Sequence, residues 1–310
     1  MNVMHYLKRI KEVSTDFYKD VRFFNVKLAV TKTLVPKLCK DSDKMHQAIL
    51  DYLEPRYADF VQSYVGLEQS SSIVLTDDCP IWVCWLQGED QMPFICKKCM
   101  ESIRKHAGKH PVIMITFDNY QEYVTVPSYI LEKVGKEISY THFSDILRVN
   151  LLADHGGMWM DSTIYVTQDL PDWNLPFYTL KQDLPNDKSY FSLYRWSGFF
   201  QGGVKNNLFH CFLRDFLYLY YEKEKALIEY SLMDYIIDIG YRYVPAIKQM
   251  VDKVPYSCQG IHELRKMLYL PLDKDKLNTL IKQNYAFKLT YKNMPAEIDP
   301  HSVYYYLFCR

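Results

Sequence analysis

One segment, residues 141–166, constrains the fold of this chain more than any other part of the sequence. It reads THFSDILRVNLLADHGGMWMDSTIYV, an apolar helical pattern followed by two glycines and a strand pattern. Ser144 is expected to cap the helix, with Asp145 in its first turn, where the helix dipole stabilises negative charge. Asp145 and Arg148 are three residues apart, so a helix projects both side chains from one face.

The two glycines and the residues after them add a third charged group. Gly156 and Gly157 favour the left-handed backbone that ends a helix abruptly. Residues 158–160 start a strand, Asp161 follows it, and residues 164–166 resume an apolar run. In α/β proteins, ligands bind at the carboxyl ends of the central strands. Asp161 is therefore predicted to lie in a binding site.

Strand and helix patterns alternate on both sides of this segment. Residues 81–85 and 112–117 are predicted strands, Pro93 opens a helix that ends near residue 106, and residues 128–134 form a short helix. This alternation predicts an α/β fold with a mostly parallel central sheet and helical cover. After residue 190 the predicted elements are helices at 208–223, 226–238, 243–251 and 261–268 and a strand at 287–291.

The N-terminal part of the chain has a different character. Residues 1 to about 64 read as helical, with a break at residues 41–43, and a polar joint at residues 68–72 precedes the first predicted strand. The sequence thus predicts a helical N-terminal extension over residues 1–76. An α/β domain with a helical C-terminal part is predicted over residues 77–310.

Charge also distinguishes the extension from the rest of the chain. The formal net charge is zero, which gives no indication of nucleic-acid binding. The first 40 residues contain nine Lys or Arg against three acids, interleaved with apolar residues. This pattern indicates a helical extension packed on the main domain or, as the alternative, a basic surface that rests on anionic lipid. No apolar run approaches the roughly 20 residues that span a bilayer.

Cysteine usage and the start of the sequence favour the cytoplasm. Eight cysteines are scattered without a disulfide framework, and the first residues lack the apolar core of an export signal. Cys96 and Cys99 form a CxxC pair within a predicted helix, without a second pair at zinc-ribbon spacing. We interpret them as half-buried helix residues. We expect a cytoplasmic protein, with peripheral contact at the inner face of the plasma membrane as the alternative.

Several motifs, taken in order, resemble those of a known family. They are IWVCWLQGEDQMP at 81–93, SDILR at 144–148 and LLADHGGMWMDST at 151–163, with looser matches in FFQGGVKNN at 199–207 and KLTYK at 288–292. The chain is similar to the capsular polysaccharide synthesis proteins, relatives of glycosyltransferase family 32, the sugar transferases with a DXD motif. The resemblance implies a GT-A-like fold, a nucleotide-diphosphate sugar donor, a divalent cation and retention of anomeric configuration.

The resemblance also implies where the donor binds. Trp85, just past the first strand, is expected to stack on the nucleobase, and Gln87 to hydrogen-bond it. In the family, the pair that matches Asp145 and Arg148 contacts the donor sugar hydroxyls and the diphosphate, which suits a carboxylate and a guanidinium. Gly157, in the third matching block, is included in the expected donor-binding set.

The Mn²⁺ or Mg²⁺ ion that the resemblance implies needs hard oxygen ligands, and Asp161 is expected to be one of them. Where relatives often carry a second Asp, this chain has Thr163, which offers only a neutral hydroxyl. Metal binding is then either weaker and dependent on the diphosphate, or completed by another carboxylate. The candidates are Asp234, Glu263 and Asp299.

The leaving diphosphate requires positive charge or hydrogen-bond donors around it. Lys288, Lys292, His262 and His301 are the candidates, and Lys292 is placed in the expected donor-binding set. The alternative for each is a solvated surface residue.

Three functions remain open at this stage. The first is a retaining hexosyltransferase that moves a sugar to a glycan or lipid-linked glycan in capsular or other surface polysaccharide synthesis, with Asp145, Arg148 and Asp161 as catalytic residues. The second is a glycoside hydrolase with Asp145 and Asp161 as its carboxylate pair, in which Arg148 and Trp85 have no purpose. The third is a non-catalytic nucleotide-sugar or glycan-binding subunit of an assembly complex.

Overall fold

A five-stranded sheet of order β2-β1-β3-β6-β5 lies at the centre of the computed structural model, which describes residues 3–34, 42–70, 72–187 and 190–309. β1 is parallel to β2 and β3, whereas β6 is antiparallel to β3 and β5. Four of the five strands therefore run in one direction, and the predicted mostly parallel sheet is confirmed. The strands are β1 (Ile81–Cys84), β2 (Val112–Ile115), β3 (Gly157–Met160), β5 (Phe177–Thr179) and β6 (Phe200–Gly203).

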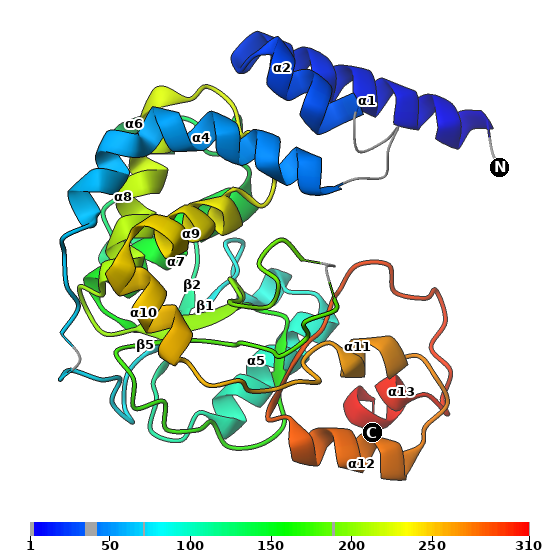
Figure 1. The fold of residues 1–310 in the computed structure, drawn as a ribbon. Helices are drawn as coiled ribbons and strands as arrows, with labels where there is room; N and C mark the ends of the chain where they lie inside the picture. Colours follow the sequence, from blue (N-terminus) through cyan, green and yellow to red (C-terminus); the bar gives the residue numbers. More distant parts are fainter. Residues whose placement is uncertain (1–2, 35–41, 71, 188–189, 310) are drawn as a thin grey trace.

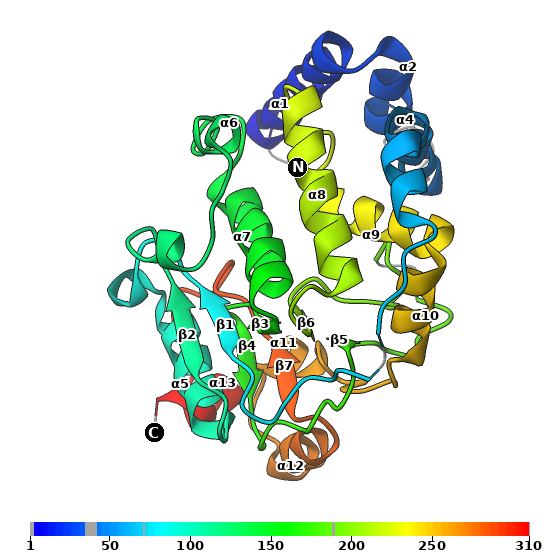
Figure 2. The same cartoon turned by 90° about the vertical axis from the view of Figure 1, so that its left-hand side faces the viewer.

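Helices lie on both sides of this sheet, as Figures 1 and 2 show. One side carries α7 (Tyr140–Asp154), α8 (Leu208–Lys223), α9 (Leu232–Tyr243) and α10 (Pro245–Lys253). The other side carries α5 (Phe94–His106), α11 (Glu263–Met267), α12 (Lys274–Gln283) and α13 (Val303–Phe308). Short helical turns occur at η2 (Glu89–Gln91), η3 (Tyr120–Glu122) and α6 (Ser128–Leu131). A separate antiparallel pair, β4 (Ile164–Val166) and β7 (Ala286–Lys288), joins the middle of the chain to its C-terminal part.

The N-terminal part is helical, as predicted. It consists of α1 (Val3–Phe23), α2 (Val26–Ala29), the π-helical turn η1 (Val30–Leu34) and α4 (Ser42–Tyr64). α1 and α2 lie far from the sheet (Figure 1), whereas α4 packs on the main body through Tyr57, whose ring lies 4.6 Å from that of Phe216. The predicted break at residues 41–43 falls partly outside the described residues. The boundary at residue 76 and the contact with lipid remain predictions, and no described helix has the length and apolarity to cross a bilayer.

The helix of the central segment begins earlier than the sequence indicates. Its N-cap is Ser139, whose side chain accepts a hydrogen bond from the backbone N–H of His142, and not Ser144. The earlier start buries Phe143, whose ring packs edge-on against Tyr120 at 5.4 Å. Asp145 consequently lies in the second turn of α7, where the helix dipole contributes less than expected.

The helix predicted at 226–238 is also displaced, because α9 occupies Leu232–Tyr243. The buried hydroxyl of Tyr220 donates a hydrogen bond to the Ala226 carbonyl and accepts one from the Ile228 N–H, both at 2.8 Å. These bonds satisfy the loop backbone without a helix. The loop that results carries Tyr230 towards the edge of the sheet where Asp161 lies.

Gly202 on β6 provides a test of the strand packing. A Cβ at this position would overlap the carbonyl oxygen of Gly157 and the sulfur of Met158 on β3, so Gly202→Ala should lower the free energy of unfolding by about 1–3 kcal/mol. Urea denaturation measures this difference. Gly66→Ala is the control, because nothing lies within 4 Å of its added Cβ. Equal stability of both variants would contradict this packing.

Candidate active site

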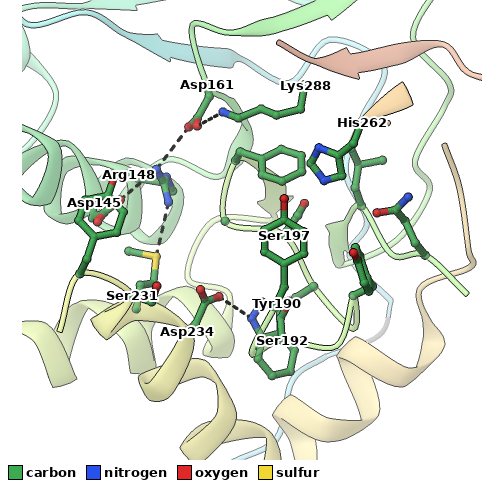
Figure 3. A pocket seen from close by; sticks show the side chains of 18 of the residues that line it. Asp145, Arg148, Asp161, Tyr190, Ser192, Ser197, Ser231, Asp234, His262 and Lys288 are labelled. Atoms are coloured by element: carbon green, nitrogen blue, oxygen red, sulfur yellow. Dashed lines mark hydrogen bonds and ion pairs between the residues drawn. The ribbon is translucent and has the colours of Figure 1, made fainter. Parts of the chain in front are cut away.

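The carboxyl ends of β1 and β3 bring the predicted site residues together. These strands are parallel neighbours, so Trp85 and Asp161, which follow them, lie at the same edge of the sheet. The Asp161 N–H donates to the carbonyl of Phe199, just before β6, at 2.9 Å. α7 faces this edge, and Figure 3 shows Arg148 between Asp145 and Asp161. The sequence prediction that these residues share one site agrees with their placement.

An ion-pair network joins these side chains. A terminal nitrogen of Arg148 lies 3.0 Å from Asp145 Oδ1 and 3.4 Å from Asp161 Oδ1. Lys288 Nζ lies 2.5 Å from Asp161 Oδ2 (Figure 3), and Trp159 Nε1 donates to Asp161 Oδ1 at 2.9 Å. The Arg148 guanidinium also lies over the Trp159 ring, 4.8 Å from its centroid. Asp161 is thus held by two cations and an indole.

The small sheet explains how Lys288 reaches Asp161 from a distant part of the chain. β4 starts at Ile164, just after Asp161, and Ile164 pairs with Lys288 on β7. The backbone N–H of Leu289 then bonds to the Thr163 carbonyl at 2.9 Å. Pairing of β4 with β7 therefore fixes the lysine beside the carboxylate. Of the lysines proposed from the sequence, Lys288 is the one that contacts Asp161.

Protonation differs between the two carboxyl groups that flank Arg148. Burial alone would raise the pKa of Asp161, but the positive charges of Lys288 and Arg148 outweigh it and hold that pKa below its ordinary value. Burial dominates at Asp145 and raises its pKa, against the opposing charge of Arg148. The site therefore keeps Asp161 ionised and destabilises the ionised form of Asp145, a separation typical of functional carboxyl pairs.

One side of the network opens into a cavity of about 750 Å³, here called the Trp85 compartment. Trp85 lines it, and the ring of Tyr291 stands edge-on to the indole at 5.5 Å. Trp85 Nε1 is buried and has no hydrogen-bond partner among the described residues. The remaining lining includes the residues predicted to contact the base, the metal and the leaving diphosphate, and one further cation. These residues are Gln87, Thr163, Arg265 and Lys292.

A second cavity of about 380 Å³, the Asp234 compartment, lies on the other side of the network. Its walls come from the loop at 190–199, the start of α9 and His262, and Figure 3 shows how they surround the space. The two compartments share one boundary, where a ligand in one would meet a ligand in the other. The shared residues are Thr141, Asp145, Arg148, Asp161, Tyr230 and Lys288.

Asp234 is held by an indole and not by a cation. Trp196 Nε1 donates to Asp234 Oδ1 at 2.9 Å, and no ion pair with a Lys or Arg of the described ranges involves this carboxylate. Burial, aided by the nearby charge of Asp145 and opposed by Trp196 and Arg148, raises the pKa of Asp234 to about 6. A carboxyl group with a perturbed pKa that faces a cavity is a candidate functional residue.

The expected divalent cation has few protein ligands here. Asp161 is already paired with Lys288 and Arg148, and Thr163 adds only a hydroxyl to the same cavity. Within the described part of the chain, no cluster of three or more His, Cys, Asp or Glu residues is arranged to hold a metal. These potential ligands do not fit a metal centre built by the protein alone. The cation stays a prediction.

Other residues proposed from the sequence lie outside both compartments. Gly157 begins β3, at the end opposite Asp161, and a Cβ there would overlap the Pro80 carbonyl, so its role is close packing. Glu263 pairs with Lys266 at 2.6 Å, Asp299 bonds to the backbone of its own loop, and His301 is exposed. Of the three further metal candidates, Asp234 alone lines one of the two compartments.

The CxxC cysteines are deeper than expected. Cys96 and Cys99 lie on α5, and both are fully buried in an apolar cluster with Leu264 and Phe287. Burial raises the pKa of Cys96 to about 11 and that of Cys99 well above its ordinary value. Both thiols therefore remain protonated at neutral pH and pack as small apolar groups.

Several lining residues carry no signal that the sequence alone could reveal. Tyr190 belongs to a segment without helix or strand periodicity, and Tyr230 to a segment wrongly predicted as helix, in a chain where 27 tyrosines make any one of them inconspicuous. Arg265 and Tyr291 reach the cleft only because the C-terminal part folds back through β7. A weak signal exists for Trp196, which stands just before the FFQGG block.

Comparisons with known proteins agree with the motifs. Residues 34–307 match a family model described as "Capsular polysaccharide synthesis protein", which confirms the resemblance and includes α4. No curated protein matches the chain. A solved structure described as "PaToxG Glycosyltransferase" is similar over 67% of this chain and 80% of that chain, with 15% sequence identity and a TM-score of 0.37.

The raised pKa of Asp234 predicts a stability change with a definite sign. Because the folded protein binds this proton more tightly than the unfolded chain, the group makes stability fall as pH rises from about 4 to about 6. Asp234→Asn removes the charge and keeps an oxygen for Trp196. The variant should be more stable than the wild type by about 1–2 kcal/mol at about pH 7.5, with little difference at about pH 4. Urea denaturation at both pH values measures this, and a variant destabilised at both would contradict it.

Proposed function

The chain belongs to the capsular polysaccharide synthesis protein family, and from this premise we propose that it is a glycosyltransferase that moves a sugar from a nucleotide-diphosphate donor to a glycan acceptor. The observation that carries the proposal is the Asp145–Arg148–Asp161–Lys288 network at the boundary of two cavities. A transferase must bring two substrates together at one point, and this boundary offers such a point.

The Trp85 compartment suits a nucleotide diphosphate. Trp85 and Tyr291 offer aromatic faces and edges to a base at one end, where Gln87 can also form hydrogen bonds. Arg265 and Lys292 add positive charge to that of Arg148 and Lys288 around the same space. Guanidinium and ammonium groups are the side chains that bind phosphate oxygens most strongly. The volume of about 750 Å³ lies within the range of ligand cavities.

The network suits the sugar and the leaving group. Asp145 and Asp161 can accept hydrogen bonds from sugar hydroxyls, while Arg148 and Lys288 face the diphosphate. In the proposed reaction the bond from the anomeric carbon to the diphosphate breaks with its electron pair on the phosphate oxygen, and the acceptor oxygen bonds to that carbon. The hydroxyl proton passes to the departing diphosphate, and in a retaining reaction attack comes from the same face. Cations fixed before the reaction stabilise the charge that develops.

The cations of the site argue against a glycoside hydrolase. Such an enzyme needs one protonated and one ionised carboxyl group, and the raised pKa of Asp145 beside the lowered pKa of Asp161 meets that requirement. The carboxyl pair alone therefore does not distinguish the two reactions. The four cations around the Trp85 compartment do, because they have no counterpart in an uncharged oligosaccharide.

Neutralising either carboxylate of the network should remove activity. Asp145→Asn and Asp161→Asn lose a charge-assisted contact to the sugar and disturb Arg148, so each should slow transfer by at least about 100-fold. Release of nucleotide from a panel of UDP- and GDP-sugars measures the rate, and circular dichroism checks the fold. Asp154→Asn, which alters an acid at the end of the same helix, is the control. Near wild-type turnover in both site variants would remove them from the active site.

Lys288 and the divalent cation can be compared in one binding experiment. If Lys288 supplies charge at the diphosphate, Lys288→Met should weaken binding of UDP or GDP by about tenfold or more in the presence of EDTA. Calorimetric titration with EDTA, Mg²⁺ or Mn²⁺ measures the affinity of both proteins. Binding that requires Mn²⁺ and ignores Lys288 would assign the charge to the metal. Failure of every nucleotide to bind would favour a non-catalytic subunit.

A further inference from the structure

The Asp234 compartment lies where the second substrate of a transferase must be. A donor that extends from Trp85 to the network ends with its sugar against Asp145 and Asp161, which form part of the wall of both cavities. The group that attacks the sugar must approach from beyond that boundary. The cavity of about 380 Å³ opens there, between the network and the loop at 190–199 (Figure 3).

The lining of this cavity suits an uncharged ligand with many hydroxyl groups. Its cations, Arg148 and Lys288, are the shared ones and are already paired with Asp145 and Asp161. Besides Asp234, His262 and two aliphatic side chains, the rest of the wall is mainly aromatic rings, hydroxyls and an amide. These side chains are Gln182, Tyr190, Ser192, Tyr194, Ser197, Phe199, Tyr230 and Ser231. Such a wall offers apolar contact area and hydrogen bonds, and its described residues offer no unpaired positive charge for a phosphate.

Two polar groups in the wall remain available to a ligand. His262 Nδ1 is buried and has no hydrogen-bond partner among the described residues, and the ring stacks on Tyr190 at 5.6 Å. Burial, together with the charge of Lys288, lowers the pKa of His262, so the ring is neutral at pH 7. In Asp234, Oδ1 already accepts the hydrogen bond from Trp196 Nε1, so Oδ2 is the carboxylate oxygen that a ligand can use. A buried polar atom without a partner is costly, and a ligand hydroxyl would supply the missing hydrogen bond.

We propose that the Asp234 compartment is the acceptor site, that it takes an uncharged sugar, and that Asp234 accepts a hydrogen bond from a hydroxyl of that sugar other than the one that attacks the donor. Trp196 acts as a positioning residue, because its indole N–H fixes the carboxylate. Tyr190, which is 45% exposed, offers a face for the apolar side of a pyranose ring. This inference rests on the proposed function and adds the acceptor class and its contacts.

The test separates transfer to an acceptor from transfer to water. Nucleotide release from UDP- and GDP-sugars is measured with and without a panel of methyl glycosides and neutral disaccharides. Asp234→Asn and Tyr190→Ala should lose the glycoside-dependent increase by about tenfold or more. Their affinity for UDP or GDP, measured by calorimetry, should stay within about threefold of the wild type, because neither residue lines the Trp85 compartment. Asp252→Asn, an exposed acid on α10 that pairs with Lys248, is the matched control and should behave as the wild type.

Several outcomes would overturn the assignment. A loss of UDP or GDP affinity in Asp234→Asn as large as the loss of the glycoside response would place the donor in this cavity. An unchanged glycoside response in both variants, or no response of the wild type to any glycoside, would remove the sugar acceptor from it. Failure of the proposed function gives a different result, because the wild type would then neither bind UDP or GDP nor release nucleotide from any donor. The acceptor assignment would fall with it.

Discussion

The half-buried carboxylate of Asp161 sets the conditions that the rest of the site must meet. A charge taken out of water is tolerated only when it is paired and hydrogen-bonded. Three segments contribute to that pairing, because Arg148 comes from α7, Trp159 from β3 and Lys288 from β7. Lys288 follows Asp161 by 127 residues along the chain. Lys288 reaches Asp161 through the pairing of β4 with β7, so the charge balance of the site depends on the C-terminal part folding back across the edge of the sheet.

The same network determines how the cleft is divided. Because Arg148, Asp161 and Lys288 occupy its middle, the space on either side becomes two cavities with different chemistry. Additional cations gather on the Trp85 side, where Arg265 and Lys292 lie, and on the other side the described residues contribute none beyond those already paired. A fold alone does not specify a reaction, so it is this contrast in lining that supports a charged donor and an uncharged acceptor.

The sequence predicted the local part of this arrangement and missed the part that depends on distant contacts. The spacing of Asp145 and Arg148 and the position of Asp161 after a strand follow from helix and strand geometry, and all three residues are brought together as expected. The strands β5 and β6 were not predicted, since they are three or four residues long and give no periodic signal. The start of α9 was misplaced because one buried hydroxyl, on Tyr220, holds the preceding loop. No local pattern encodes such a contact.

Asp234 shows the difference between a carboxyl group that stabilises the fold and one that is kept for a ligand. Asp161 has two cations and a depressed pKa, so its charge is compatible with burial. Asp234 has an indole as its hydrogen-bond partner and a raised pKa, so its charge costs stability at neutral pH. An Asn at that position would satisfy Trp196 equally well without the charge. Natural proteins tolerate such a cost mainly at functional sites, which is the physical reason to assign Asp234 to substrate binding.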